Sequence, residues 1–111
     1  MDLTYLRMMS DGDKAFEKEM IEISLSYIPE VMLQLQSEIE QVNTHGIKST
    51  AHKLKSSFFI MGIDDESILI KLELEDIVDL ATLKQLYFRL DNIQLTSIKC
   101  LKTELINLSM A

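Results

Sequence analysis

The chain has 111 residues, and 18 acidic side chains against 11 basic ones give it a formal net charge of −7. This length suffices for one hydrophobic core, so we expect a single domain over residues 1–111. The negative charge argues against a nucleic-acid-binding protein, which needs a broad basic surface. Apolar residues make up 47%, with only three Gly and one Pro, which favours a helical protein over a turn-rich β fold.

The sequence also constrains where the protein works. Cys100 is the only cysteine, so an internal disulfide is excluded and an intracellular setting is favoured. No apolar run approaches the roughly 18 residues of a membrane span. The first residues lack the long apolar region of a signal peptide. We therefore expect a cytoplasmic protein that does not insert into a membrane.

The first part of the chain predicts three helices. Residues 2–9 form a short amphipathic helix, and the polar residues 10–13 form a turn that caps the next one. Residues 13–27 form the second helix, and Pro29 ends it and begins a third over 29–42, because proline suits a first helical turn. The apolar faces of the second and third helices are Phe16, Met20, Ile23 and Tyr27, and Met32, Leu35, Ile39 and Val42.

The next helix covers the segment between about Asn43 and Gly62. Asn43 or Thr44 caps its start, and Gly62 permits close packing or closes its end. Its apolar residues repeat at helical spacing and form one stripe: Ile47, Ala51, Leu54, Phe58 and Met61.

Two further helices complete the chain. Residues 64–66 place negative charge at the start of a helix that runs to about Val78, with Ile68, Leu69, Leu72 and Ile77 available for burial. Thr82 caps the last helix, which either continues to residue 108 or breaks near Asp91–Asn92 or Thr96. Its apolar residues are Leu83, Leu86, Leu90, Ile93, Leu101, Leu105 and Leu108.

Long amphipathic segments with short connections favour one architecture. We expect an all-α protein, an antiparallel four-helix bundle with a short additional N-terminal helix. The connection over residues 62–65 is too short for anything but an antiparallel neighbour.

The most informative segment is residues 42–63, which contain no Asp or Glu in an otherwise acidic chain. A helical projection places His52 away from the apolar stripe. A lone helical histidine is ordinarily a surface or core residue, and lysines on an outer face are ordinarily only solvated. Here the histidine and the lysines coincide with small and aromatic side chains. This combination indicates a site that binds an anion and docks a partner. The residues around His52, one or two turns away, are Lys48, Lys55, Ser56 and Phe59.

The residues from Ala51 to Gly62 resemble the signature of histidine-containing phosphotransfer domains, the HPt family. That pattern is a His followed by Leu, Lys, a small residue and Ser at successive positions from the second onward, with a Gly about ten positions on. The family often has Gly where this chain has Ser56, which is still small enough for close approach. The family's order of helices also describes nearly the whole chain. The matching residues are His52, Leu54, Lys55, Ser56, Ser57 and Gly62.

The resemblance implies a phosphorelay intermediate in two-component signal transduction. His52 would accept a phosphoryl group from a phospho-aspartate on one receiver domain and pass it to another. Such a domain is a phosphoryl carrier and not an enzyme, it binds no cofactor, and the Mg²⁺ belongs to the receiver. Family members are commonly monomers, so we expect a monomer here.

The local chemistry assigns roles to the neighbours of His52. Neutral imidazole is a good nucleophile at pH 7. Lys55 can stabilise the charge of the phosphoryl oxygens, since phosphoryl transfer depends on positioning and charge stabilisation. Lys48, Ser56 and Phe59 are the predicted docking face for a receiver, with Phe59 as an apolar anchor.

Three alternatives compete with this interpretation. The phosphoacceptor domain of a sensor kinase usually has an acid after its His and then a Pro, whereas Lys53 follows His52 here. A metal site is disfavoured because His45 and His52 are seven residues apart, and paired His ligands on a helix are normally four apart. The third alternative is a helical-bundle adaptor without phosphotransfer.

Overall fold

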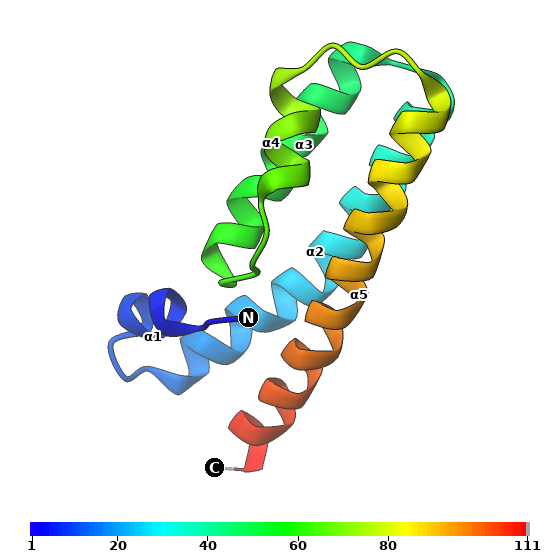
Figure 1. The fold of residues 1–111 in the computed structure, drawn as a ribbon. Coiled ribbons are helices and arrows are strands. Elements are labelled where there is room, and N and C mark those ends of the chain that lie inside the picture. The colour runs from blue at the N-terminus through cyan, green and yellow to red at the C-terminus, as the bar shows by residue number, and fades with distance from the viewer. Residues whose placement is uncertain (111) are drawn as a thin grey trace.

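The computed structural model describes residues 1–110, over which helices are the only regular secondary structure, and this confirms the predicted all-α class (Figure 1). Its five helices are α1 (Thr4–Ser10), α2 (Lys14–Glu40), α3 (Thr44–Ile60), α4 (Ser67–Leu74) and α5 (Leu80–Met110).

The two long helices, α2 and α5, lie side by side and antiparallel, and they form the backbone of the molecule (Figure 1). Helix α3 runs back along α2, and α4 packs mainly on α3, with fewer contacts to α5. This pair covers one half of the long helices, and α1 packs against the other half of α2. The result is an elongated molecule of 48 × 20 × 18 Å.

Helix α2 runs without interruption through Pro29, so the predicted break there is wrong. Proline removes one backbone hydrogen bond and ordinarily kinks a helix at a cost of about 3 kcal/mol. Here Ile28 and Val31 are buried on either side of the proline, and Met32 follows. Burial of three apolar side chains, worth about 1.5–3 kcal/mol each, offsets the lost hydrogen bond and keeps the helix in one piece.

The first half of α2 also buries a different face from the one predicted. Phe16, Ile23 and Tyr27 are 38%, 52% and 39% exposed. The buried stripe instead contains Glu17, Ile21, Ser24 and Ile28. The periodicity is compatible with either face, because both carry apolar residues at helical spacing.

An ion-pair network explains why Glu17 faces inward. Arg7 on α1 lies 3.4 Å from the carboxylate of Glu17 and 2.7 Å from that of Glu104 on α5. Buried carboxylates are tolerated when they are paired. The network thereby ties α1, α2 and α5 together at this end of the molecule.

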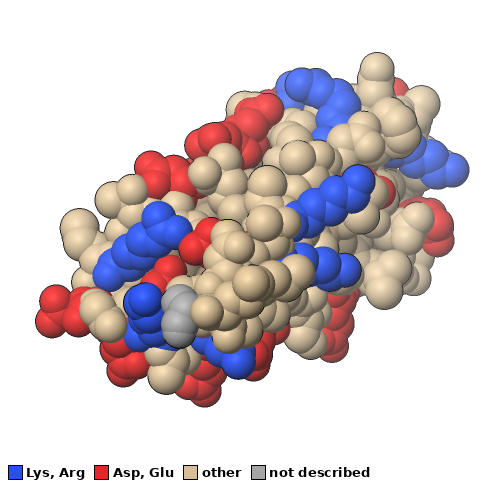
Figure 2. Space-filling model, turned by 90° about the horizontal axis from the view of Figure 1, so that it is seen from below, with Lys and Arg blue, Asp and Glu red and all other residues tan. Residues whose placement is uncertain are grey.

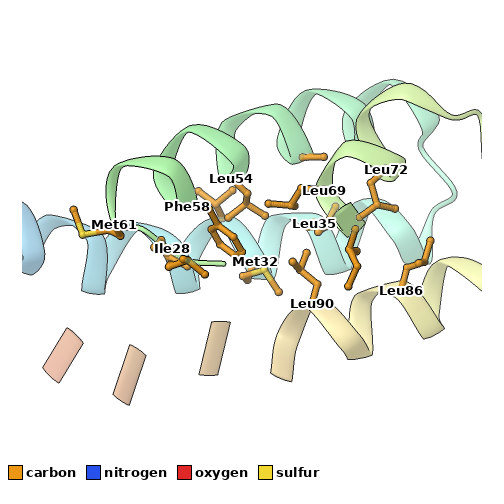
Figure 3. Close-up of a cluster of buried hydrophobic side chains, with 14 of the residues drawn as sticks. Ile28, Met32, Leu35, Leu54, Phe58, Met61, Leu69, Leu72, Leu86 and Leu90 are labelled. Carbon is orange, nitrogen blue, oxygen red and sulfur yellow. The ribbon is translucent and has the colours of Figure 1, made fainter. Parts of the chain in front are cut away.

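The core is built from apolar side chains of all five helices. Every residue of the apolar stripe predicted for α3 is buried. Figure 3 shows Phe58 reaching from α3 toward Met32 on α2, with Leu90 of α5 close by. Of the other predicted core positions, most are buried, and six are partly buried: Met20, Val42, Ile77, Ile93, Leu105 and Leu108.

The helix starts follow the expected capping rules, with one correction. The Asp13 side chain accepts a hydrogen bond from the Phe16 amide at the start of α2. Asn43 accepts one from the Gly46 amide at the start of α3, which confirms Asn43 as a cap. At α5 the cap is Asp79, which accepts from the backbone and hydroxyl of Thr82, so the prediction of Thr82 is wrong.

The boundaries of the last two helices also differ from expectation. Helix α4 ends at Leu74 and not near Val78, because Glu75 adopts an extended conformation. Val78 is 69% exposed, so nothing in the core holds a longer helix together. Helix α5 is continuous over 31 residues, about 46 Å, and contains none of the possible breaks.

Candidate functional site

His52 lies in the middle of α3 on the face opposite the core. Ala51 and Leu54 beside it are fully buried, whereas 65% of the His52 side chain is exposed. Helical geometry produces this contrast, because adjacent residues point about 100° apart. The imidazole is therefore held on a rigid helix and remains open to a partner.

A carboxylate from the next helix holds one edge of the imidazole. Glu73 on α4 places Oε1 2.6 Å from His52 Nδ1, and its Oε2 lies 2.6 Å from Lys55 Nζ. The Glu73 side chain is only 18% exposed, and α4 packs on α3, so the carboxylate is fixed between the His52 imidazole and the Lys55 ammonium. The Lys55 ammonium, followed by the His52 imidazole, lowers the pKa of Glu73. Glu73 is therefore an acceptor at neutral pH.

This contact determines the state of the neutral ring. An ionised carboxylate only accepts hydrogen bonds, so Nδ1 of His52 carries the hydrogen. The lone pair of neutral imidazole is then on Nε2. The arrangement thus presents Nε2 as the nucleophilic nitrogen.

The two lysines nearest His52 are paired with acids, so they are not the free surface charges expected from the sequence. Lys55 pairs with Glu73, and Lys48 pairs with Asp76, which follows α4. Both lysine side chains are 33% exposed and therefore half-buried. The segment that looks basic in the sequence is largely neutralised in three dimensions.

An aromatic pair lies one to two turns beyond His52 on the same face. Phe59 is 57% exposed, as predicted, and its ring centroid lies 4.9 Å from that of Tyr5 on α1. Ser56 is exposed as well. A shallow hollow runs beside these residues, lined by Tyr5, Lys55, Ser56, Phe59, Ile60 and Glu66.

Gly62 links α1 to this face. It ends α3 with a left-handed backbone (φ +61°), and the amides of Gly62 and Ile63 bond back to the carbonyls of Phe59 and Phe58. Its carbonyl accepts a hydrogen bond from the amide of Asp2, 2.8 Å away. A Cβ at this position would lie 1.5 Å from the Asp2 carbonyl oxygen. Gly62 therefore lies at the end of α3, as predicted, and the close approach that it permits is to the backbone of Asp2.

On one face of the molecule, charged side chains do not gather by sign. On the face drawn in Figure 2, basic and acidic side chains are interspersed with uncharged ones. Within residues 1–110, no cluster of three or more His, Cys, Asp or Glu has the arrangement of a metal site. Among the same residues, no helix combines the length and apolar character needed to cross a membrane.

Comparison with known proteins adds no relatives. The chain matches no family model, no curated protein and no solved structure.

Sequence reasoning missed three residues of this site: Glu73, Asp76 and Tyr5. Glu73 and Asp76 lie more than 20 positions after His52, and helical periodicity carries no information about contacts between helices. One signal was available. The run Glu73–Asp76 contains three acids and directly follows the apolar residues of α4, which was predicted to lie antiparallel to the basic helix.

Proposed function

We propose that this protein is an HPt-type phosphorelay intermediate in two-component signal transduction. His52 accepts a phosphoryl group from the phospho-aspartate of one receiver domain and passes it to an aspartate of another. The observation that carries this proposal is the exposed imidazole whose Nδ1 is occupied by Glu73, with Lys55 beside it. A surface histidine without a function needs neither the carboxylate nor the shared lysine.

The geometry supports a simple transfer step. The Nε2 lone pair of His52 attacks phosphorus, and the P–O bond to the donor aspartate breaks with its electron pair left on the carboxylate. Lys55 lies one turn from His52 on the same helix and contacts the carboxylate that holds the ring, and in this proposal its ammonium stabilises the added negative charge. Charge stabilisation and positioning are what phosphoryl transfer requires from a protein. The Mg²⁺ belongs to the receiver, and the chain acts as a carrier and not as an enzyme.

The arrangement of helices fits this function. In our interpretation α2, α3, α4 and α5 form an antiparallel four-helix bundle, and α1 is the short additional N-terminal helix. The bundle keeps His52 on a rigid helix, so specificity depends on protein–protein contact and not on a substrate pocket. We propose a cytoplasmic monomer that binds neither nucleic acid nor membrane.

The receiver would dock around His52 on a mixed surface. Phe59, supported by Tyr5, supplies the apolar anchor, and Ser56 keeps the helix surface flat next to the imidazole. Lys48 contributes to the rim, where its pairing with Asp76 moderates its charge. A small interface of this kind suits a relay, which has to release its partner quickly.

Transfer from charged receiver domains tests the proposal. A panel of receivers is charged with radiolabelled acetyl phosphate and mixed with the wild type, His52→Gln or His45→Gln. His45 is the matched control, because it is exposed on the same helix two turns earlier. We expect acid-labile, base-stable label on the wild type and on His45→Gln, and none on His52→Gln. A correctly folded wild type that takes no label from any receiver would favour the adaptor alternative.

A further inference from the structure

The Glu73 contact has consequences for the phosphorylated form of the protein, which rest on the proposed function. We propose that Glu73 is a positioning residue that keeps the Nδ1 hydrogen on His52 after phosphorylation, so that the phosphoryl group is held as a labile phosphoimidazolium. The ring is thereby kept ready for onward transfer and is not a stable store of phosphate.

Phosphorylation changes how hydrogens are distributed on the imidazole ring. In the resting state Nδ1 carries the hydrogen that Glu73 accepts, and Nε2 carries the lone pair. When Nε2 forms its bond to phosphorus, the ring uses that lone pair and becomes a cation. The ring can then lose the Nδ1 hydrogen to solvent and become neutral, or it can keep the hydrogen and remain charged.

Glu73 favours the charged ring. Its Oε1 lies 2.6 Å from Nδ1, so a neutral phosphorylated ring would direct its Nδ1 lone pair at a carboxylate oxygen. A retained hydrogen keeps the bond and places a cation against an anion. A buried carboxylate that stabilises the imidazolium form of a histidine is an established device in catalytic triads.

Lys55 prevents the hydrogen from moving to the carboxylate. Its ammonium lies 2.6 Å from Oε2, and this pairing is the first cause of the lowered pKa of Glu73. The hydrogen therefore stays on nitrogen. Glu73 keeps its charge whether or not the ring is phosphorylated.

The charged ring makes both transfers free of proton movement. When the N–P bond breaks toward an incoming aspartate oxygen, its electron pair returns to Nε2 and the neutral Nδ1–H imidazole is recovered. A neutral phosphorylated ring would have to leave as an imidazolate, which is a far poorer leaving group. A retained Nδ1 hydrogen therefore speeds the departure of the phosphoryl group.

The charged groups around the ring are those of α3 and α4. From α3 they are Lys48, Lys53 and Lys55, and from α4 and the segment after it they are Glu73 and Asp76. On the α2 side the acid that contacts α3 is Glu38, whose carboxylate accepts a hydrogen bond from Thr50. Glu73 is the one carboxylate among the described residues that contacts the imidazole of His52.

The test follows the stability of phosphohistidine against pH without any receiver. The wild type, Glu73→Gln and the matched control Glu75→Gln are phosphorylated with phosphoramidate, the donor is removed, and ³¹P NMR follows the loss of label from pH 6 to 9. Glu75 is an exposed acid two residues on, paired with Lys71. We expect the wild type and Glu75→Gln to lose label at a rate nearly independent of pH. For Glu73→Gln, the rate of label loss should fall as the pH rises, because its phosphorylated ring loses the Nδ1 hydrogen. One pH unit above the midpoint of that deprotonation, label loss should be roughly tenfold slower than in the wild type.

Each result has a separate meaning. Identical pH profiles for the wild type and Glu73→Gln would overturn the role of Glu73 and leave the proposed function standing. Absence of phosphohistidine at His52 in the folded wild type would overturn both. If Glu73→Gln does not fold, ¹⁵N NMR of the unmodified wild type gives a second measurement. Hydrogen on Nδ1 supports the proposal, and hydrogen on Nε2 contradicts it.

Discussion

His52 Nδ1 and Glu73 Oε1 lie 2.6 Å apart, although the two residues are 21 positions apart in the chain. The contact joins α3 to α4, and Lys55 shares the same carboxylate through Oε2. Three side chains from two helices thus form one unit. A change in any of them is expected to affect the other two, which is the basis of the first two predictions.

We expect Lys55→Ala to slow phosphoryl transfer without unfolding the protein. A loss of about 1.4 kcal/mol of transition-state stabilisation corresponds to tenfold in rate, and a loss of this order is reasonable for one half-exposed cation. Transfer rates from a charged receiver provide the measurement. Lys53→Ala is the control, since Lys53 is exposed on the same turn and forms no ion pair within residues 1–110. Equal rates for both variants would remove Lys55 from the site.

The pairing of Glu73 predicts a specific pH dependence of stability. The folded pKa of Glu73 is lowered below its usual 4.5, first by Lys55 and then by His52. The contribution of ionised Glu73 to the free energy of unfolding is therefore complete above its usual pKa. This contribution is lost as the pH falls through the lower folded pKa. We expect the melting temperature of Glu73→Gln to fall below that of the wild type at pH 7, and the difference to shrink below about pH 4.

Thermal melts between pH 3 and 7 measure this difference. Glu75→Gln is the control, because an exposed pair such as Lys71–Glu75 is worth about 0–1 kcal/mol. If the difference in melting temperature between the wild type and Glu73→Gln were the same at pH 3 as at pH 7, the assigned pairing would be contradicted.

Features of the fold that depend on neighbouring residues could be predicted from the sequence, and features that depend on contacts between helices could not. The buried stripe of α3 and the Asn43 cap are local, and they follow from helical spacing and capping chemistry. The continuity of α2 through Pro29 was not predictable, because it depends on burial on both sides of the proline. Contacts between helices, such as that of Glu73 with His52, were missed because helical periodicity carries no information about them.

The exposed face of α2 shows the limit of periodicity alone. Phe16 and Glu17 are adjacent, and hydrophobicity favours burying Phe16. The structure buries Glu17 because Arg7 neutralises it from α1. The position of α1 brings Arg7 to Glu17 and so favours burial of the carboxylate, and the hydrogen bond from Asp2 to Gly62 helps to hold α1 there.

Gly62→Ala is expected to destabilise the protein and to release α1. A left-handed backbone costs an alanine about 1–2 kcal/mol. At Gly62 the new Cβ would also collide with the Asp2 carbonyl. Gly12→Ala is a matched control, since Gly12 has φ +83° but a Cβ there would meet no atom within 4 Å. Hydrogen exchange over residues 1–10 and thermal melts should separate the two, and equal effects would show that the Asp2 contact is unimportant.

Phe59→Ala is expected to weaken receiver binding more than it weakens folding. Phe59 is 57% exposed and forms a tilted aromatic pair with Tyr5, so its loss should cost less than about 1.5 kcal/mol of stability. Since Phe59 is the proposed anchor of the interface, its replacement by Ala should cost about 2 kcal/mol of binding free energy.

Titration calorimetry with a receiver and denaturant unfolding give the two values. Phe88 on α5 is a control of similar exposure, 66%, and its replacement by Ala should leave receiver binding unchanged. A larger loss in stability than in binding for Phe59→Ala would place this side chain among the structural residues.

Onward transfer is the most direct test of the central claim that His52 relays a phosphoryl group. The labelled wild type is separated from its donor and mixed with a second, uncharged receiver domain, and the label on each protein is followed with time. The account predicts that label leaves His52 and appears on the receiver as acid-stable, base-labile acyl phosphate, while His52→Gln neither carries nor passes any. Label that stays on the chain, or that His52→Gln carries and passes equally well, would contradict the account.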